Sequence, residues 1–179
     1  MFEMLYYCGL RRGECRGLQW SDIDWKNKQV SITKQANSVK DSQKYYELTP
    51  PKTSKSIRTL PLTDILYNDL VNLYNEKKKY YYGFNDKWFV FGEVDPLTFG
   101  MMHRINKRIA ENADIRRIPL HSFRHSCASL LINTGQPPTT VSKYLGHAST
   151  KETLDTYAHM FPNNLENVKN TIDNLNLGI

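Results

Sequence analysis

The chain has 179 residues, of which 40% are hydrophobic, and its formal net charge at neutral pH is +6. This length suits one domain with a short tail, and no apolar run approaches the roughly 20 residues that a membrane span requires. The three cysteines are scattered and form no Cys-x-x-Cys pair, so neither a disulfide framework nor a zinc ribbon is indicated. The N-terminus is acidic and lacks the basic segment of a signal peptide. We therefore expect a reduced, cytoplasmic compartment and no membrane association.

The positive charge is concentrated in two segments. Residues 1–62 contain 11 Lys and Arg against 6 Asp and Glu, and residues 101–125 contain 6 against 2. If the fold brings these segments together, they form a face suited to phosphate groups. Two solvated basic surfaces that bind nothing would have the same composition. The charge alone therefore leaves nucleic-acid binding open.

The first part of the chain is predicted to hold two short helices and three strands. Residues 1–8 have the pattern of a helix end that Gly9 terminates, and a second short helix is predicted over residues 12–18. Alternating side chains and β-branched residues then predict the strands. These strands lie at residues 29–33, 45–48 and 57–62. We expect a small three-stranded antiparallel sheet, with a turn or a sheet edge at Pro50 and Pro51.

From residue 63 onward the pattern is helical. Thr63 can cap a helix that runs to about Lys79, and residues 88–91 form a short apolar stretch, either a strand or a buried loop. Further helices are predicted at residues 97–113, 121–134, 138–145, 150–158 and 163–177. The expected fold class is mainly α with one small antiparallel sheet (α+β). We expect one domain over residues 1–162, followed by a C-terminal helix or tail over residues 163–179.

Five short motifs follow one another along the chain. They are Gly9-Leu10-Arg11-Arg12-Gly13-Glu14, Pro51-Lys52-Thr53, His121-Ser122-Phe123-Arg124-His125, Leu145-Gly146-His147 and Thr153-Leu154-Asp155-Thr156-Tyr157-Ala158-His159. Each motif alone is weak, because a single arginine is usually solvated and the chain has 11 tyrosines to choose from. In this combination and order, the motifs resemble those of the tyrosine recombinases. The surrounding sequence is similar to integrases of phages and conjugative transposons of Gram-positive bacteria.

The two arginines of these motifs suit a phosphodiester. The transition state of phosphoryl transfer concentrates negative charge on the non-bridging oxygens, and planar guanidinium groups bind such oxygens with forked hydrogen bonds. Arg11 and Arg124, from distant segments, could clamp both oxygens. Charge that is fixed in place before reaction contributes a few kcal/mol per group. His121 stands three residues before Arg124, so a helix would place both on one face.

The resemblance implies roles for the remaining basic residues. His121 would help to activate the nucleophile and hold the phosphate, and His147 would donate a hydrogen bond to the phosphate. Lys52, in a hairpin between the last two strands, would act as the general acid that protonates the departing 5′ oxygen. Lys55 is close enough in sequence to be a rival for that role. Glu14 would buttress the active site.

Tyr157 is the nucleophile that the resemblance implies. A free phenol has a pKa of about 10, so roughly one molecule in a thousand is ionised at neutral pH, and a base or positive surroundings are needed. Attack would form a 3′-phosphotyrosine and release a 5′ hydroxyl. The covalent bond conserves the phosphodiester energy, so we expect strand exchange and religation without a metal ion, ATP or any other cofactor.

The resemblance also implies partners. These are double-stranded DNA recombination sites, a homotetramer of the full-length protein on DNA, and an excisionase. The C-terminal helix is predicted to carry an apolar stripe of Leu165, Val168, Ile172 and Leu175. This stripe could pack on its own domain, and the resemblance implies that it docks into a neighbouring protomer. Compared with the family, the chain begins inside the catalytic domain and lacks its first helix and the upstream core-binding domain. We therefore expect this chain alone to be a monomer.

Three other interpretations compete with this one. A metal site could use His121 and His125 with Cys127, but a metalloprotease would need glutamate where Ser122 stands. A non-catalytic DNA-binding protein would explain the basic segments and helices, but not the order of Lys52, His147 and Tyr157. A type IB topoisomerase uses similar chemistry, and the compact spacing of the motifs favours a recombinase over it.

Overall fold

The computed structural model describes residues 1–39, 45–51, 53–161, 169, 170 and 172–174. The helices are α1 (Phe2–Tyr7), α2 (Arg12–Gly17), α3 (Asp64–Tyr80), α4 (Phe99–Asn112), α5 (Ser122–Asn133), α6 (Pro138–Leu145) and α7 (Thr150–Tyr157). The strands are β1 (Ile23–Asp24), β2 (Gln29–Ile32), β3 (Gln35–Ser38), β4 (Tyr46–Thr49) and β5 (Arg58–Pro61). Short 3₁₀ turns are η1 (Trp20–Asp22), η2 (Ser54–Ser56) and η3 (Ala158–Met160). The mainly α class with small antiparallel sheets is confirmed.

The strands form two sheets. One has the order β1-β2-β5 and the other pairs β3 with β4, all antiparallel. The prediction placed the strand near residues 45–48 in the three-stranded sheet, and this is wrong because β1 takes that place. β4 pairs instead with β3, a strand that was not predicted. Its sequence Gln35-Ala36-Asn37-Ser38 is polar except for Ala36, which is buried, so it lacks the β-branched signal of a strand.

The helices begin and end where local chemistry favours it. The Thr63 hydroxyl accepts the Leu66 N–H at 3.3 Å at the start of α3, as predicted, and Thr98 caps α4 in the same way. α6 has Pro138 at its first position and ends at Gly146 in the left-handed conformation, with φ 69°. This left-handed end turns the chain sharply into the segment that carries the next motif.

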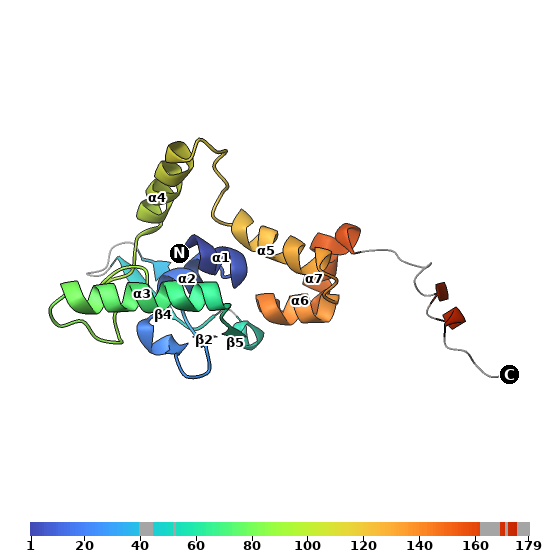
Figure 1. The fold of residues 1–179 in the computed structure, drawn as a ribbon, viewed down its shortest axis with the longest axis horizontal. Coiled ribbons are helices and arrows are strands. Elements are labelled where there is room, and N and C mark those ends of the chain that lie inside the picture. The colour runs from blue at the N-terminus through green and yellow to red at the C-terminus, as the bar shows by residue number, and fades with distance from the viewer. Residues whose placement is uncertain (40–44, 52, 162–168, 171, 175–179) are drawn as a thin grey trace.

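Two groups of buried side chains hold the domain together. The larger joins α1, α2, the three-stranded sheet and α3 and includes Leu5, Trp20 and Val30. The smaller joins α5, α6 and the end of α7 around Ile132 and Leu145. Each large side chain that is fully buried contributes about 1.5–3 kcal/mol. Figure 1 shows α5 beside α1 and next to α6, so the two groups are adjacent. α4 joins the larger group through Met102 near its start, and the rest of this helix extends away from the other helices.

The C-terminal helix predicted over residues 163–177 lies largely outside the described residues. Within it, residues 169, 170, 172 and 173 are helical. Of the predicted apolar stripe, only Ile172 is described, and it is exposed. Among the described residues, none of the helices combines the length and the apolar character that crossing a bilayer would demand.

Candidate active site

A pocket of about 280 Å³ lies where the N-terminal end of α2 meets α5, α7 and the turn between α6 and α7. Five of the six predicted catalytic residues line it: Arg11, His121, Arg124, His147 and Tyr157. They come from four separate segments, and the fold brings them together. The sixth, Lys52, lies outside the described residues. Its neighbours Pro51 and Thr53 line an adjoining pocket of about 330 Å³, which Arg11 also lines.

Arg11 is held by the first turn of α2. Its backbone N–H donates to Oε2 of Glu14 at 2.9 Å, and its Nη1 donates to Oε1 of the same carboxylate at 2.9 Å. Its Nη2 donates to the Gly146 carbonyl at 3.1 Å. The three-residue spacing of the motif is thus the spacing of a helix cap, which fixes the guanidinium to its own helix. The Arg11 side chain remains 35% exposed, so a ligand can still reach it.

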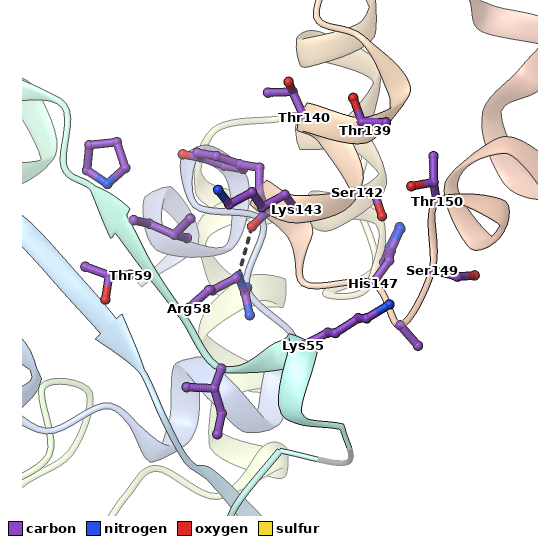
Figure 2. A pocket seen from close by; sticks show the side chains of 15 residues that line it. Lys55, Arg58, Thr59, Thr139, Thr140, Ser142, Lys143, His147, Ser149 and Thr150 are labelled. Atoms are coloured by element: carbon purple, nitrogen blue, oxygen red, sulfur yellow. Dashed lines mark hydrogen bonds between the residues drawn. The ribbon is translucent and has the colours of Figure 1, made fainter.

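Glu14 is buried between two arginines. Arg58 of β5 donates from Nη2 to Oε2 of Glu14 at 3.0 Å, and its Nε donates to the Tyr144 carbonyl at 2.9 Å (Figure 2). Burial alone would raise the pKa of Glu14, but the charge and hydrogen bonds of Arg58, joined by those of Arg11, lower it below the ordinary value. Glu14 is therefore a carboxylate that orients both arginines.

Gly146 allows these groups to approach. A Cβ at this position would lie 2.9 Å from Nη1 of Arg58, and the φ of 69° is disfavoured for other residues. The glycine of the Leu145-Gly146-His147 motif therefore permits both the turn and the contact with Arg58. The Gly146 carbonyl also accepts a hydrogen bond from Arg11, so the turn that carries His147 contacts both Arg11 and Arg58.

Arg124 enters the pocket from α5. Its Nη1 donates to the carbonyls of Gly9 at 2.7 Å and Leu145 at 2.8 Å. Its Nη2 is buried and has no hydrogen-bond partner within the described part of the chain. Burial, followed by the nearby charge of Arg11, lowers the pKa of Arg124 to about 10. A buried donor beside a second cation is a site that favours an anion.

His147 is buried next to these arginines. Its Nδ1 lies 2.7 Å from the Thr153 hydroxyl, and its Nε2 lies 3.6 Å from Oε1 of Glu152. Burial, followed by the charge of Arg124, lowers its pKa to about 4. The imidazole is therefore neutral at physiological pH. If Thr153 donates to Nδ1, the ring proton lies on Nε2, where it can be donated to a ligand.

Tyr157 ends α7 with its side chain only 5% exposed. Its hydroxyl lies 2.6 Å from Nδ1 of His125. Burial raises the pKa of Tyr157, and the charge of Arg124 opposes this in part. The hydroxyl is therefore protonated at neutral pH and hydrogen-bonded within the pocket.

His121 and Lys55 occupy the edges of the site. His121 precedes the first residue of α5 and is exposed, with its ring centroid 6.1 Å from that of His125 in an edge-on arrangement. Lys55 lies in η2 and lines a neighbouring pocket together with His147. Figure 2 shows its amine directed toward the turn that carries His147. Lys55 thus keeps its place as the rival of Lys52.

The residues considered as metal ligands have different surroundings. His125 contacts the Tyr157 hydroxyl, whereas the buried Sγ of Cys127 lies 3.7 Å from the Tyr7 carbonyl, to which it donates. Among the described residues, no three or more His, Cys, Asp or Glu side chains form a cluster that could hold a metal ion.

Sequence reasoning missed three contacts of this site. Arg58 is one arginine in a predicted strand, and His125 was considered only as a metal ligand. Thr153 lies four residues before Tyr157, so the helical period could have placed both on the same buried face. For Arg58 no local signal exists, because its partner Glu14 is 44 positions away.

A mainly helical domain in which a tyrosine at a helix end faces two arginines, each from a different segment, defines the catalytic domain of a tyrosine recombinase. The chain belongs to the phage integrase family, whose sequence model matches residues 1–164. This confirms the family that the motifs predicted.

Individual relatives agree with this placement. The chain is 31% identical over 180 residues to the ICEBs1 integrase of Bacillus subtilis strain 168, covering 97% of this chain and 48% of that protein. Its fold is similar to that of the Tn1549 transposon integrase in complex with transposon right end DNA, with TM-score 0.73, 22% identity, and coverage of 97% of this chain and 57% of that one. It is also similar to the catalytic domain of bacteriophage HP1 integrase, with TM-score 0.56, 20% identity, and coverage of 92% and 76%. The chain spans about half the length of the curated relatives it matches.

Proposed function

We propose that this chain is the catalytic domain of a site-specific DNA recombinase that cleaves and rejoins DNA through Tyr157. The observation that carries the proposal is the pocket that Arg11, Arg124 and Tyr157 line together, where Nη2 of Arg124 is buried and has no hydrogen-bond partner among the described residues. Such a donor gains most from an anion that brings its own acceptor oxygens. A backbone phosphate of DNA is such an anion.

The reaction follows from this arrangement. Arg11 and Arg124 hold the non-bridging oxygens of the scissile phosphate, and Nε2 of His147 donates a further hydrogen bond. His121, at the mouth of the pocket, adds a contact to the phosphate. Donors of this kind contribute about 2.7–4 kcal/mol each when their charge is fixed before the reaction. Tyr157 attacks the phosphorus, and the 5′ oxygen departs.

The leaving 5′ oxygen requires a proton. Lys52 supplies it in this proposal, because the residues on either side of it line the pocket adjoining Arg11. The product is a 3′-phosphotyrosine, which a 5′ hydroxyl of another strand attacks in the reverse reaction. None of these reaction steps uses a metal ion or a nucleotide cofactor.

We also propose how the chain works in a longer protein. Residues 1–162 form the catalytic domain, which acts in the cytoplasm on double-stranded recombination sites as part of a homotetramer. Residues 163–179 dock into a neighbouring protomer, because their predicted apolar stripe suits a helix that packs against another protein. An excisionase sets the direction of the reaction, and the chain alone is a monomer. Deleting residues 163–179 should weaken assembly on DNA and leave the fold intact; unchanged assembly would count against docking.

Covalent trapping tests the central proposal. A pool of nicked duplexes with randomised sequence around the nick is incubated with the chain, and protein–DNA adducts are detected by denaturing electrophoresis. The short piece between the cleavage site and the nick, which carries the new 5′ hydroxyl, diffuses away after cleavage, so the adduct accumulates. We expect an adduct with the wild type and none with Tyr157→Phe, which keeps the ring but lacks the attacking oxygen.

A matched tyrosine controls for the substitution itself. Tyr74→Phe removes a hydroxyl that donates to Asp86 at 2.9 Å, outside the pocket, and should leave the adduct unchanged. DNA affinity of Tyr157→Phe should equal that of the wild type. An adduct that persists in Tyr157→Phe, or no adduct in the wild type with any sequence of the pool, would refute the proposal.

A further inference from the structure

Among the described residues, the side chain hydrogen-bonded to the hydroxyl of Tyr157 is that of His125, which ends one of the five motifs but was given no part in the reaction. We propose that His125 is a catalytic residue that accepts the phenolic proton of Tyr157 as this hydroxyl attacks DNA. The inference rests on the proposed function of the site. It assigns to His125 the step that the resemblance implies for His121.

The geometry of the contact carries the inference. Nδ1 of His125 and the hydroxyl oxygen of Tyr157 are 2.6 Å apart, and the two rings are 5.9 Å apart between centroids. A second contact joins α5 to the segment that follows Tyr157: one turn after His125, the Ser129 hydroxyl donates to Sδ of Met160 at 3.6 Å. The segment that carries the nucleophile is therefore held against the face of α5 that carries His125.

His121 is placed differently. Both histidines are exposed, but His121 precedes α5 and its ring lies edge-on to that of His125, whereas Nδ1 of His125 lies 2.6 Å from the phenolic hydroxyl. It lines the pocket and can still reach a phosphate there. A general base that takes a proton directly lies about 2.6–3.2 Å from the donor, and Nδ1 of His125 already lies at this distance from the Tyr157 hydroxyl before DNA binds.

The protonation states agree with a transfer from the phenol to the imidazole. Partial burial, followed by the charges of His121 and Arg124, lowers the pKa of His125 below its ordinary value, so its ring is neutral at pH 7. Burial raises the pKa of Tyr157, so its hydroxyl still carries a proton. A neutral imidazole can accept at Nδ1 when its own proton is on Nε2.

The proton moves in the same step as bond formation. As the phenolic oxygen bonds to phosphorus, the O–H bond breaks and its proton binds Nδ1, while the bond from phosphorus to the 5′ oxygen breaks and that oxygen takes a proton from a lysine. The phenol becomes acidic only as its oxygen gives electrons to phosphorus, which makes transfer to a weaker base feasible. The positive charge formed on His125 is balanced by the negative charge that develops on the phosphate. In the reverse step, His125 returns the proton to the departing phenolate.

Asparagine at position 125 separates a base from a group that only positions the hydroxyl. The side-chain oxygen of Asn lies close to where Nδ1 of His lies, so His125→Asn keeps a hydrogen-bond acceptor and loses the basic nitrogen. A sequence from the nicked pool that traps the wild type serves as the probe, and the rate of adduct formation in a single turnover is measured. We expect His125→Asn to slow this rate by roughly 10²–10⁴-fold with unchanged DNA affinity. His103→Asn on α4 is the matched control and should keep the wild-type rate.

A second substrate shows on which side of the phosphorus His125 acts. A 5′-bridging sulfur in place of oxygen leaves without a proton, so it compensates for a missing acid but not for a missing base. The defect of His125→Asn should persist with this substrate. A rate within threefold of wild type for His125→Asn, or a defect that the sulfur substrate removes, would overturn the inference. In both cases the wild-type adduct would still support the proposed function, whereas loss of that adduct would refute both.

Discussion

Replacing Arg58 with methionine should destabilise the protein by about 3 kcal/mol at pH 7, because it leaves the carboxylate of Glu14 buried with one cationic partner fewer. The Glu14 side chain is 1% exposed and the Arg58 side chain 6% exposed, so water cannot replace the lost partner. Removing one member of a buried ion pair costs about 3–5 kcal/mol. Arg11 still contacts Glu14, which places the expected loss at the lower end of this range.

Chemical and thermal unfolding measure this loss. For a chain of this size, about 3 kcal/mol corresponds to a decrease in Tm of roughly 6–12 °C. Arg108→Met on α4 is the matched control, since that side chain is exposed and should change the free energy of unfolding by less than about 0.5 kcal/mol. Adduct formation should also slow in Arg58→Met, because Glu14 and the turn at Gly146 both position Arg11.

The pH dependence tests the cause. Because the pKa of Glu14 is lowered in the folded protein, its ionisation stabilises the fold above the unfolded pKa of 4.5, and this contribution is lost as the pH falls through the folded pKa. Arg58→Met raises that folded pKa, so the difference in free energy of unfolding between variant and wild type should be smaller at pH 4 than at pH 7. A difference below about 1 kcal/mol at pH 7, or one that is equal at both pH values, would refute the role given to the Glu14–Arg58 pair.

Three further predictions concern the pocket. Thr153→Val removes the hydroxyl that lies 2.7 Å from Nδ1 of His147 and that, as a donor, would keep the ring proton on Nε2. Adduct formation should slow about tenfold, the equivalent of one hydrogen bond, and Tm should fall by roughly 2–4 °C because a buried ring nitrogen loses its partner; an unchanged rate would show that the tautomer does not depend on Thr153. Lys52→Ala should abolish most adduct formation with the oxygen substrate, and the 5′-bridging sulfur substrate should restore it. Lys55→Ala should form the adduct at close to the wild-type rate. The opposite result would assign the role of general acid to Lys55. Folding lowers the pKa of His147 from 6.5 to about 4, so the folded protein favours the neutral ring. This contribution to stability is fully present above pH 6.5 and is lost as the pH falls from 6.5 to 4. His147→Gln should therefore make the decrease in Tm over this interval less steep, and an equally steep decrease would contradict this prediction.

The sequence predicted the helices and the pocket better than the strand pairing, and the reason is physical. The residues of the pocket are restricted to the few side chains that bind or attack a phosphate, so their types and order are visible without coordinates. The helices from α3 onward show the expected period and caps. The segment Gln35–Ser38 becomes a strand because β4 offers it a partner and α2 packs on it, and neither condition is visible in its own four residues.

Contacts between distant segments were also hidden from the sequence. Arg58 and Glu14 are ordinary charged residues until the fold places β5 beside α2. His125 follows Arg124 in the chain, and only the packing of α5 against the end of α7 brings its ring to Tyr157. Residue type identifies the groups that we propose to contact the phosphate, whereas the groups that orient them are selected by tertiary packing.

The backbone carbonyls around the pocket explain how two cations can be held close together before DNA binds. Arg124 donates to the carbonyls of Gly9 and Leu145, and Arg11 donates to that of Gly146, so three main-chain oxygens partly offset the repulsion between the guanidinium groups. Because these carbonyls lie at the last residue of α6 or just beyond the ends of α1 and α6, they have no intrahelical partner and can accept side-chain donors. They fix the orientation of each arginine, while Nη2 of Arg124 has no hydrogen-bond partner among the residues that the structure describes. A phosphate that enters the pocket therefore meets donors already in place, and the energy of its binding need not be spent on ordering them.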